Sequence, residues 1–423
     1  MKTFLFLLVR QLFVLCTLAF VSIPTLRAQD VIDNYERFRE AYADKKYDQC
    51  VLLGEPLAKR TDHPGIQYTL AECYCQTGQP AKSLDLLDVL VERGLSYAIE
   101  DNAGFSKLQG DKRFAGYIRA FAKNRVVLDR SVLSFMIKDS LFIPEGIASD
   151  SVHHAFFVGS LAEHKVIRCA DGGSCIDFVA GERSGFWMVL GMKVSPDHKS
   201  LWICSASEQD PTNGHSGIFR FDLSSGELIE KFVMDNKEGD HLFNDIVITR
   251  DGNIYFTDSK AGKVWQKKFD NDVLAEYAAD FIYPNGIALD EVNKVLFVAD
   301  FTGLYMIDIT TGKRSPLNHQ GRTYLNGIDG LYYYKGSLIA IQDSGNHDDR
   351  VVRFYYDVKK GTITKARTLQ SVRNDFVIPT TGAIVNGHFY YIANSQLRSL
   401  QPDGTITNPE RLVNPVIFKV KLE

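Results

Sequence analysis

The stretch Asp251-Gly-Asn-Ile-Tyr-Phe-Thr-Asp258 decides the fold, because a tight Asp-Gly-Asn turn is followed at once by a short strand of β-branched and aromatic residues. Five other segments share this shape, and most of them follow a turn and precede a loop with a second strand: 155–160, 201–205, 295–300, 337–341 and 388–394. One bulky residue in each segment serves as a marker, and the six markers are spaced by 45, 53, 42, 42 and 51 residues: Phe157, Trp202, Tyr255, Phe297, Ile339 and Tyr390. A repeated four-stranded unit of about 40–50 residues is typical of a propeller blade, so we predict a mainly β fold with a six-bladed β-propeller over residues 130–423.

Two strands at the ends of this region belong to no complete unit of their own. Residues 131–138 precede the first unit, and residues 415–422 end the chain. We expect the early strand to complete the last blade beside the C-terminal strand, because this pairing removes two open sheet edges and closes the ring.

Composition limits the partners that the chain can have. The 423 residues are 45% hydrophobic and 24% charged, with a formal net charge of -4. This length is enough for a large core and favours two domains. The nearly balanced charge gives no electrostatic reason to expect nucleic acid or an anionic membrane as a partner.

Residues 1–28 have the layout of a cleavable secretory signal. Lys2 and Arg10 supply positive charge, the apolar run 11–21 follows, and Ala28 offers a small residue at the cleavage point. The apolar run is short for a bilayer span of about 20 residues, although a retained anchor is the alternative. We therefore expect an exported protein, periplasmic or secreted, with no membrane span after cleavage.

Export would permit disulfide bonds among the six remaining cysteines. Cys169 and Cys175 are separated by a turn-forming Ala-Asp-Gly-Gly-Ser segment. Two alternatives remain open for them: a local disulfide bridge, or two free thiols. The spacing of Cys73 and Cys75 is too tight for a zinc site, and we interpret these residues as small buried hydrophobic side chains.

Residues 30–126 have a helical pattern of about two repeats. Apolar residues recur at helical spacing, and Tyr47 and Pro80 hold equivalent positions 33 residues apart. The period resembles tetratricopeptide repeats, which implies a small helical array. Two interpretations remain open for this tetratricopeptide-like region: a docking surface for a protein partner, or an N-terminal brace for the propeller.

Four oxygen-bearing side chains stand at the same phase, just before four of the innermost strands: Glu145, Asn244, Asn285 and Asp329. The loop that enters each innermost strand faces the central channel, so we expect these side chains to converge on the axis. Two carboxylates and two amides form an all-oxygen set suited to a hard cation such as Ca²⁺. Without a cation, Glu145 and Asp329 would repel each other.

The motifs around these residues resemble the senescence marker protein/gluconolactonase (regucalcin-like) family. They are, in order, Pro144-Glu-Gly, Asn244-Asp-Ile, Pro284-Asn-Gly-Ile-Ala-Leu-Asp and Asp329-Gly-Leu. The resemblance covers about residues 130–423 and implies a six-bladed propeller with one divalent ion, Ca²⁺ or Mg²⁺, Mn²⁺ or Zn²⁺. It places the metal ligands on Glu145, Asn244, Asn285 and Asp329, the acid/base carboxylate on Asp329, and, in paraoxonase-like members, a further acidic role on Asp245. The loop 205–215 departs from the family pattern, so gluconolactone itself is in doubt as the substrate.

The leading hypothesis is an exported, metal-dependent hydrolase of lactones or esters. The ion would polarise the carbonyl, and Asp329 would activate water or attack directly. His241, three residues before Asn244, is a further candidate for an acid/base role, with an ordinary loop histidine as the alternative. The other functional hypothesis is a non-catalytic binding propeller with a structural ion, whose helical repeats dock a protein partner. Phosphotriester hydrolysis by the same set of residues is a third possibility.

Overall fold

The computed structural model describes residues 28–207, 214–235, 239–319, 321, 323–343, 349–371, 376 and 378–423. The predicted signal peptide therefore lies outside the described residues except for Ala28. Among the residues that are described, no helix combines the length and the apolar character needed to cross a bilayer.

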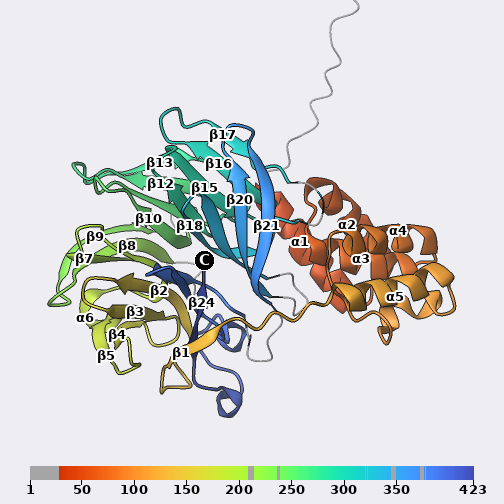
Figure 1. Ribbon diagram of the computed structural model, residues 1–423, viewed down its shortest axis with the longest axis horizontal. Coiled ribbons are helices and arrows are strands. Elements are labelled where there is room, and N and C mark those ends of the chain that lie inside the picture. Colours follow the sequence, from red (N-terminus) through yellow and green to blue (C-terminus); the bar gives the residue numbers. More distant parts are fainter. Residues whose placement is uncertain are drawn as a thin grey trace, which may run out of the picture.

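Six antiparallel sheets of four strands each are arranged around a central axis (Figure 1), which confirms the predicted fold class. The strands of blades one to three are β2 (Pro144–Asp150), β3 (Ala155–Ser160), β4 (Lys165–Ala170), β5 (Cys175–Ala180), β6 (Met188–Val194), β7 (Ser200–Ala206), β8 (His215–Asp222), β9 (Leu228–Asp235), β10 (Phe243–Ile248), β11 (Ile254–Asp258), β12 (Lys263–Lys267) and β13 (Leu274–Ala278). Those of blades four to six are β14 (Ile287–Asp290), β15 (Val295–Asp300), β16 (Gly303–Asp308), β17 (Arg314–Pro316), β18 (Ile328–Tyr334), β19 (Ser337–Gln342), β20 (Arg350–Asp357), β21 (Thr362–Ser371), β22 (Gly382–Val385), β23 (His388–Ile392), β24 (Val416–Lys421) and β1 (Val132–Met136). A short helix, α6 (Gly181–Ser184), follows the first blade.

The last blade is built from both ends of the propeller sequence. β1 pairs with β24 in antiparallel register, with Val132 opposite Lys419 and Met136 opposite Val416. The sheet order β1-β24-β23-β22 confirms the closure expected from the sequence. Each of these strands gains a neighbour that it would otherwise lack, so the ring has no open edge at this point.

Glycines let the innermost strands approach one another closely at the channel. A Cβ atom on Gly146 would lie 1.9 Å from the carbonyl oxygen of Leu190, and one on Gly286 would lie 2.3 Å from that of Asp329. Neither space accepts a side chain. The glycines that follow Glu145 and Asn285 in the sequence motifs are thus required by the packing of one blade against the next.

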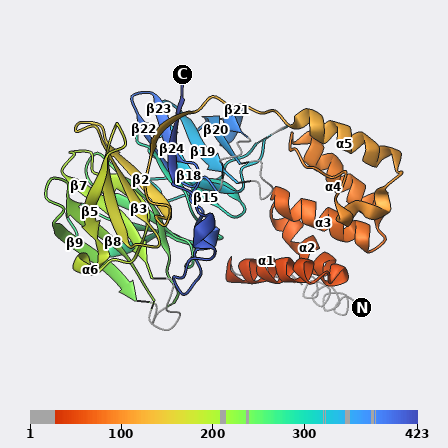
Figure 2. The same cartoon turned by 90° about the horizontal axis from the view of Figure 1, so that it is seen from below.

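The described part of the N-terminal region consists of five α-helices and a 3₁₀ helix, which lie to one side of the propeller, on the side of β20 and β21 (Figure 1 and Figure 2). They are α1 (Ala28–Ala43), α2 (Tyr47–Arg60), α3 (Pro64–Gln76), α4 (Pro80–Glu92), η1 (Ala103–Leu108) and α5 (Lys112–Asn124). Tyr47 and Pro80, equivalent in the sequence pattern, begin α2 and α4. The second helix of each repeat therefore starts where the 33-residue period places it.

Propeller side chains complete the cores of this helical region. Tyr324 is buried in the cluster formed by α3, α4 and α5, and Ile282 joins the cluster of α1, α2 and α3. Phe301 packs against the ring of Tyr35 at 4.8 Å between centroids and stacks on His63 at 5.5 Å. The helices thus bury part of their apolar surface against the propeller.

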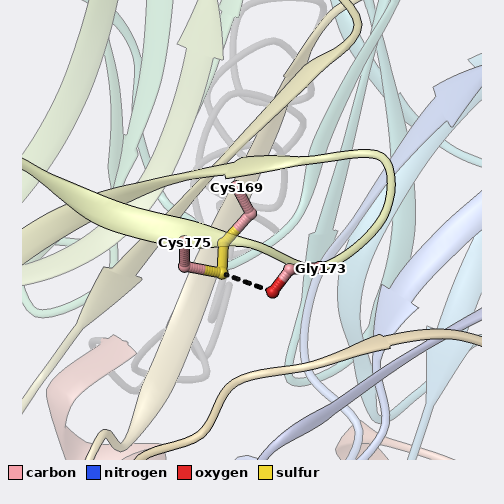
Figure 3. The surroundings of a disulfide bond; sticks show 3 residues. All are labelled: Cys169, Gly173 and Cys175. Atoms are coloured by element: carbon pink, nitrogen blue, oxygen red, sulfur yellow. Dashed lines mark hydrogen bonds between the residues drawn. A yellow bond between two sulfur atoms is a disulfide. The ribbon is translucent and has the colours of Figure 1, made fainter.

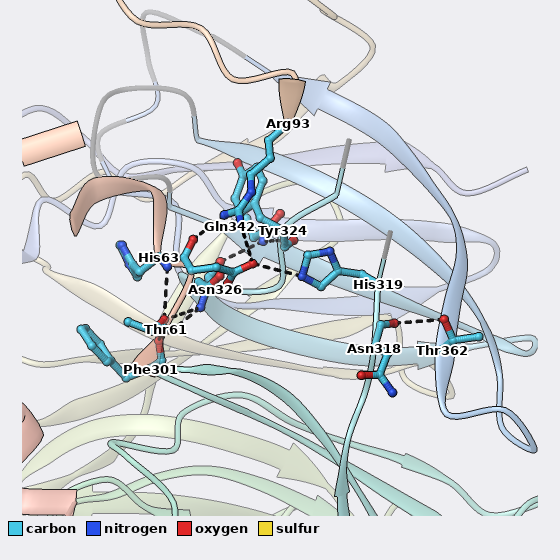
Figure 4. A network of polar contacts seen from close by, with 11 residues as sticks. Thr61, His63, Arg93, Phe301, Asn318, His319, Tyr324, Asn326, Gln342 and Thr362 are labelled. Atoms are coloured by element: carbon cyan, nitrogen blue, oxygen red, sulfur yellow. Dashed lines mark hydrogen bonds and ion pairs between the residues drawn. The ribbon is translucent and has the colours of Figure 1, made fainter. Parts of the chain in front are cut away.

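Polar contacts fix the same interface (Figure 4). The Oγ1 atom of Thr61 accepts a hydrogen bond from Asn326 Nδ2 at 3.0 Å and donates one to the Phe301 carbonyl oxygen at 3.5 Å. The Asp62 carboxylate pairs with Arg93 at 3.1 Å and with His319 at 3.2 Å. These contacts favour the brace over the docking surface, and binding of a protein partner stays a prediction.

Cys169 and Cys175 are joined by a disulfide across the turn between β4 and β5 (Figure 3). The local bridge is therefore the alternative that the structure adopts. The other described cysteines are free and buried: Cys50, Cys73, Cys75 and Cys204. Their burial agrees with the interpretation of Cys73 and Cys75 as small core residues.

Candidate metal and active site

The four predicted ligands reach one pocket at an end of the central channel. Glu145 lies in β2, Asn244 in β10, Asn285 just before β14 and Asp329 in β18, and all four line a cavity of about 300 Å³. Each residue lies at or just before the start of an innermost strand, so equivalent positions in the repeated sequence are also equivalent positions in the ring. The convergence on the axis is as expected, and metal binding by these residues stays a prediction.

Hydrogen bonds orient three of these side chains. Asn285 Nδ2 donates to Asp329 Oδ1 at 2.9 Å, and Asn244 Nδ2 donates to Ser259 Oγ at 3.0 Å. Ser259 Oγ in turn donates to the Pro284 carbonyl oxygen at 2.6 Å, which ties the third blade to the fourth. Because both amide nitrogens are used as donors, the amide oxygens are the atoms suited to coordinate a cation.

The two carboxylates of the pocket have no positively charged side chain beside them among the described residues that line it. Glu145 is buried, and its Oε2 atom has no hydrogen-bond partner among the described residues. Burial raises the pKa of Glu145 well above its usual range, and the nearby charges of Asp329 and Asp245 raise it further. Burial also raises the pKa of Asp329, to about 7. A buried carboxylate oxygen with no partner requires a proton or a cation, and the four side chains therefore fit a divalent ion.

Asp245 and Lys193 are ionisable residues of the innermost strands that do not line the pocket. Asp245 lies outside the pocket lining, and its carboxylate accepts from the backbone amides of Ile246 at 2.8 Å and Ile287 at 3.3 Å. Burial raises the pKa of Asp245, whereas Lys193 lowers it. The Lys193 ammonium lies 4.5 Å from the centre of the Tyr332 ring. Burial lowers the pKa of Lys193, and the charge of Asp245 opposes this shift. With Glu145, Asp245 and Asp329 ionised and Lys193 protonated, the four groups would carry two net negative charges, which one divalent cation would neutralise.

His241 lies beside the pocket and is held by a carboxylate. Its Nδ1 atom is 2.6 Å from Asp258 Oδ2, and the same oxygen accepts from the Trp265 indole nitrogen at 3.0 Å. Leu242 lines the pocket, but His241 does not. This geometry supports the alternative of a loop histidine with a structural partner, and the catalytic role stays a prediction.

Sequence reasoning missed the second and sixth blades at the site. Leu190 and Thr381 hold the positions in their blades that the predicted ligands hold in the other four. Each is followed by a glycine of an innermost strand, within β6 after Leu190 and at the start of β22 after Thr381. Leu190 lines the pocket, and the hydroxyl groups of Thr380 and Thr381 donate to the Glu145 carbonyl oxygen. The signal in the sequence is a Leu-Gly pair in the second blade and a Thr-Gly pair in the sixth, and only the second pair carries a side-chain oxygen.

The described residues hold no cluster of three or more His, Cys, Asp or Glu side chains arranged as a metal site. The candidate set differs from such clusters because half of it consists of amides. The loop 205–215, which departs from the family pattern, falls mostly outside the described residues.

No family model and no curated protein matches the chain. Similar solved structures include a gluconolactonase from Xanthomonas campestris, with 15% identity and a TM-score of 0.47 over 70% of this chain and 96% of that one. They also include the calcium-binding protein regucalcin from Agrobacterium tumefaciens (14%, 0.47, 68% of this chain and 93% of that one) and a PQQ-bound aldose sugar dehydrogenase from Streptomyces coelicolor (14%, 0.48, 70% and 97%). Identities and TM-scores this low leave the function to be argued from the site.

Proposed function

We propose that this chain is an exported, divalent-metal-dependent hydrolase of lactones or esters, with its site at the end of the channel that holds Glu145 and Asp329. The observation that carries the proposal is the buried Glu145 oxygen without a partner, in a cavity shared with Asp329 and two oriented amides. A site of this kind is suited to a hard cation, Ca²⁺ first, with Mg²⁺, Mn²⁺ or Zn²⁺ as alternatives.

Glu145, Asn244, Asn285 and Asp329 would hold the ion. When bound, a divalent ion supplies a Lewis acid that polarises a carbonyl oxygen. Asp329 would take a proton from the attacking water, with its carboxylate held in place by the hydrogen bond from Asn285. The oxygen of this water bonds to the carbonyl carbon, the acyl C–O bond breaks, and the leaving oxygen takes up a proton. One water molecule is consumed, and a lactone gives one hydroxy acid.

The first experiment measures hydrolysis of lactones, aryl esters and phosphotriesters by the purified mature protein, with Ca²⁺ and with a chelator. We expect turnover that needs the metal and that falls by at least about 100-fold in Asp329→Asn. Asp270→Asn is a matched control, because Asp270 is exposed between β12 and β13 and does not line the pocket. Absence of turnover on every class, with metal bound and the fold intact, would favour the binding propeller instead.

A second variant separates the two interpretations of His241. If His241 acts on the substrate, His241→Gln lowers kcat by about 100-fold or more. If it only pairs with Asp258, His241→Gln lowers the melting temperature and changes kcat little. The geometry favours the second result.

A further inference from the structure

One loop forms a cap over the candidate site. The connection between β23 and β24, residues 393–415, is longer than the equivalent connection in each of the other five blades. It contains η3 (Leu397–Ser399), η4 (Pro409–Arg411) and a β-bridge between Leu400 and Ile406. The second strand of each blade ends on the face where the innermost strands begin, so this loop lies on the same face as Glu145 and Asp329.

Side-chain contacts hold the cap in place. Gln396 Nε2 donates to the Val413 carbonyl oxygen at 2.9 Å, and its Oε1 atom accepts from the Val413 amide at 3.0 Å. Arg398 pairs with Asp343 at 3.6 Å. Leu397 and Leu400 pack against the hydrophobic cluster of the first three blades. The cap is thus tied at both of its ends and anchored to the propeller.

The walls above the polar floor are apolar. They are formed by Leu161, Met188, Leu190, Leu242, Leu397 and Leu400, with Tyr283 and Gln401 as the polar members. Among the described residues that line the cavity, the only charged side chains are the floor carboxylates Glu145 and Asp329. The apolar residues come from the first three blades and from the cap, so the apolar surface surrounds the polar floor on several sides.

We propose that the site takes lactones or esters that carry an aliphatic chain, which the cap and the leucine walls enclose, and that it excludes polyhydroxylated sugar lactones. A sugar lactone brings several hydroxyl groups that would lose their hydrogen bonds to water and find few partners on these walls. An alkyl chain gains from the same burial, about fourfold in affinity for each methylene group removed from water. This inference rests on the proposed hydrolase function for the reacting end of the substrate.

The test uses γ-lactones with alkyl substituents of increasing length, and glucono-δ-lactone, on the mature chain with Ca²⁺. We expect kcat/KM to rise about fourfold for each added methylene until the cavity is full, with glucono-δ-lactone at least about 100-fold below the best alkyl lactone. Binding of the same lactones to Asp329→Asn, measured by calorimetry, gives a readout that does not depend on turnover. Its affinities should rise with chain length in the same way.

Two cap variants locate the preference. Leu400→Gln places a polar group on the wall and should reduce the gain per methylene to about twofold. Leu412→Gln makes the same change in the same cap at a residue that packs on the cluster without lining the cavity, and it should leave the gain unchanged. An equal loss of chain-length dependence in both variants would overturn the role of the cap wall.

The outcomes separate this inference from the proposed function. Preferred hydrolysis of glucono-δ-lactone would overturn the inference and support the hydrolase. No hydrolysis, with chain-length-dependent binding to Asp329→Asn, would overturn the hydrolase and support the apolar ligand class. Neither hydrolysis nor chain-length-dependent binding would overturn both.

Discussion

The propeller and the helical region are both built from repeats, but they differ in how the repeats at their ends obtain packing partners. The propeller closes on itself, since β1 completes the sheet of β24 and every blade has a neighbour on each side. The helical region is an open array of about two repeats, fewer than the three or so that such arrays usually need. It completes its cores with Tyr324 and Ile282 of the propeller. The propeller therefore closes with its own strands, whereas the helical region needs propeller side chains to complete its cores.

Two spectroscopic signals follow the two regions separately. All three tryptophans, Trp187, Trp202 and Trp265, lie in the propeller, so tryptophan fluorescence reports on the ring. Among the described residues, the helices lie in the N-terminal region apart from the short α6, η3 and η4, so far-ultraviolet circular dichroism at helical wavelengths reports on the array.

The largest effect is expected from Tyr324→Ala. Tyr324 is a buried propeller residue in the core of the helical region, with Arg350 stacked on its ring at 4.2 Å. Loss of this ring should destabilise the array by about 4 kcal/mol and lower the melting temperature of the helical signal. The fluorescence transition should stay in place, and a shift of both signals by the same amount would show that the two regions unfold as one unit. Tyr324→Phe is the matched control.

A covalent link could compensate for the open ends of the array. The sulfur atoms of Cys50 in α2 and Cys73 in α3 lie 2.6 Å apart in the core. In the oxidising surroundings that export would supply, we expect them to form a disulfide, detectable by mass spectrometry of the non-reduced, digested protein. Cys50→Ala should then lower the stability of the array by about 3 kcal/mol. Cys75→Ala is the control, because Cys75 packs in the other helical cluster.

Metal binding should act on the ring alone. A cation held by Glu145, Asn244, Asn285 and Asp329 connects four blades, and at a concentration 100 times the Kd it stabilises the folded state by about 2.7 kcal/mol. We expect a chelator to lower the melting temperature of the fluorescence signal. The melting temperature of the helical signal should fall only if unfolding of the propeller removes the contacts that stabilise the helical region. An unchanged fluorescence transition with and without Ca²⁺ would contradict the site.

The smallest effect is expected from pH at the interface. Burial lowers the pKa of His63 from 6.5 to about 4, against the opposing charges of Asp343 and Asp62. Between these values the unfolded chain binds a proton that the folded protein does not, so stability is complete above pH 6.5 and falls as the pH drops toward 4. His63 keeps some exposure, and the loss should be about 2 kcal/mol. His63→Asn keeps a capping acceptor for α3 and should remove this pH dependence from the helical signal.

The sequence predicts what repeats and misses what occurs once. The six strand markers and the shared phase of Glu145, Asn244, Asn285 and Asp329 are periodic, and the structure shows each of these side chains at the position that the phase implies. The brace depends on contacts such as that between Thr61 and Phe301, separated by 240 residues, which no local pattern contains. The cap, residues 393–415, has neither the alternation of a strand nor the period of a helix, so its sequence pattern does not predict that its leucines line the site.

The pairing of β1 with β24 also sets an order of events during synthesis. When the ribosome has released β23, the chain holds the helical array and the strands of five blades, yet the sixth blade lacks the strand that joins its two halves. That strand is β24, Val416–Lys421. A nascent chain that has not yet released β24 therefore lacks the closed ring, and synthesis of Val416–Lys421 decides whether the six blades share one closed architecture.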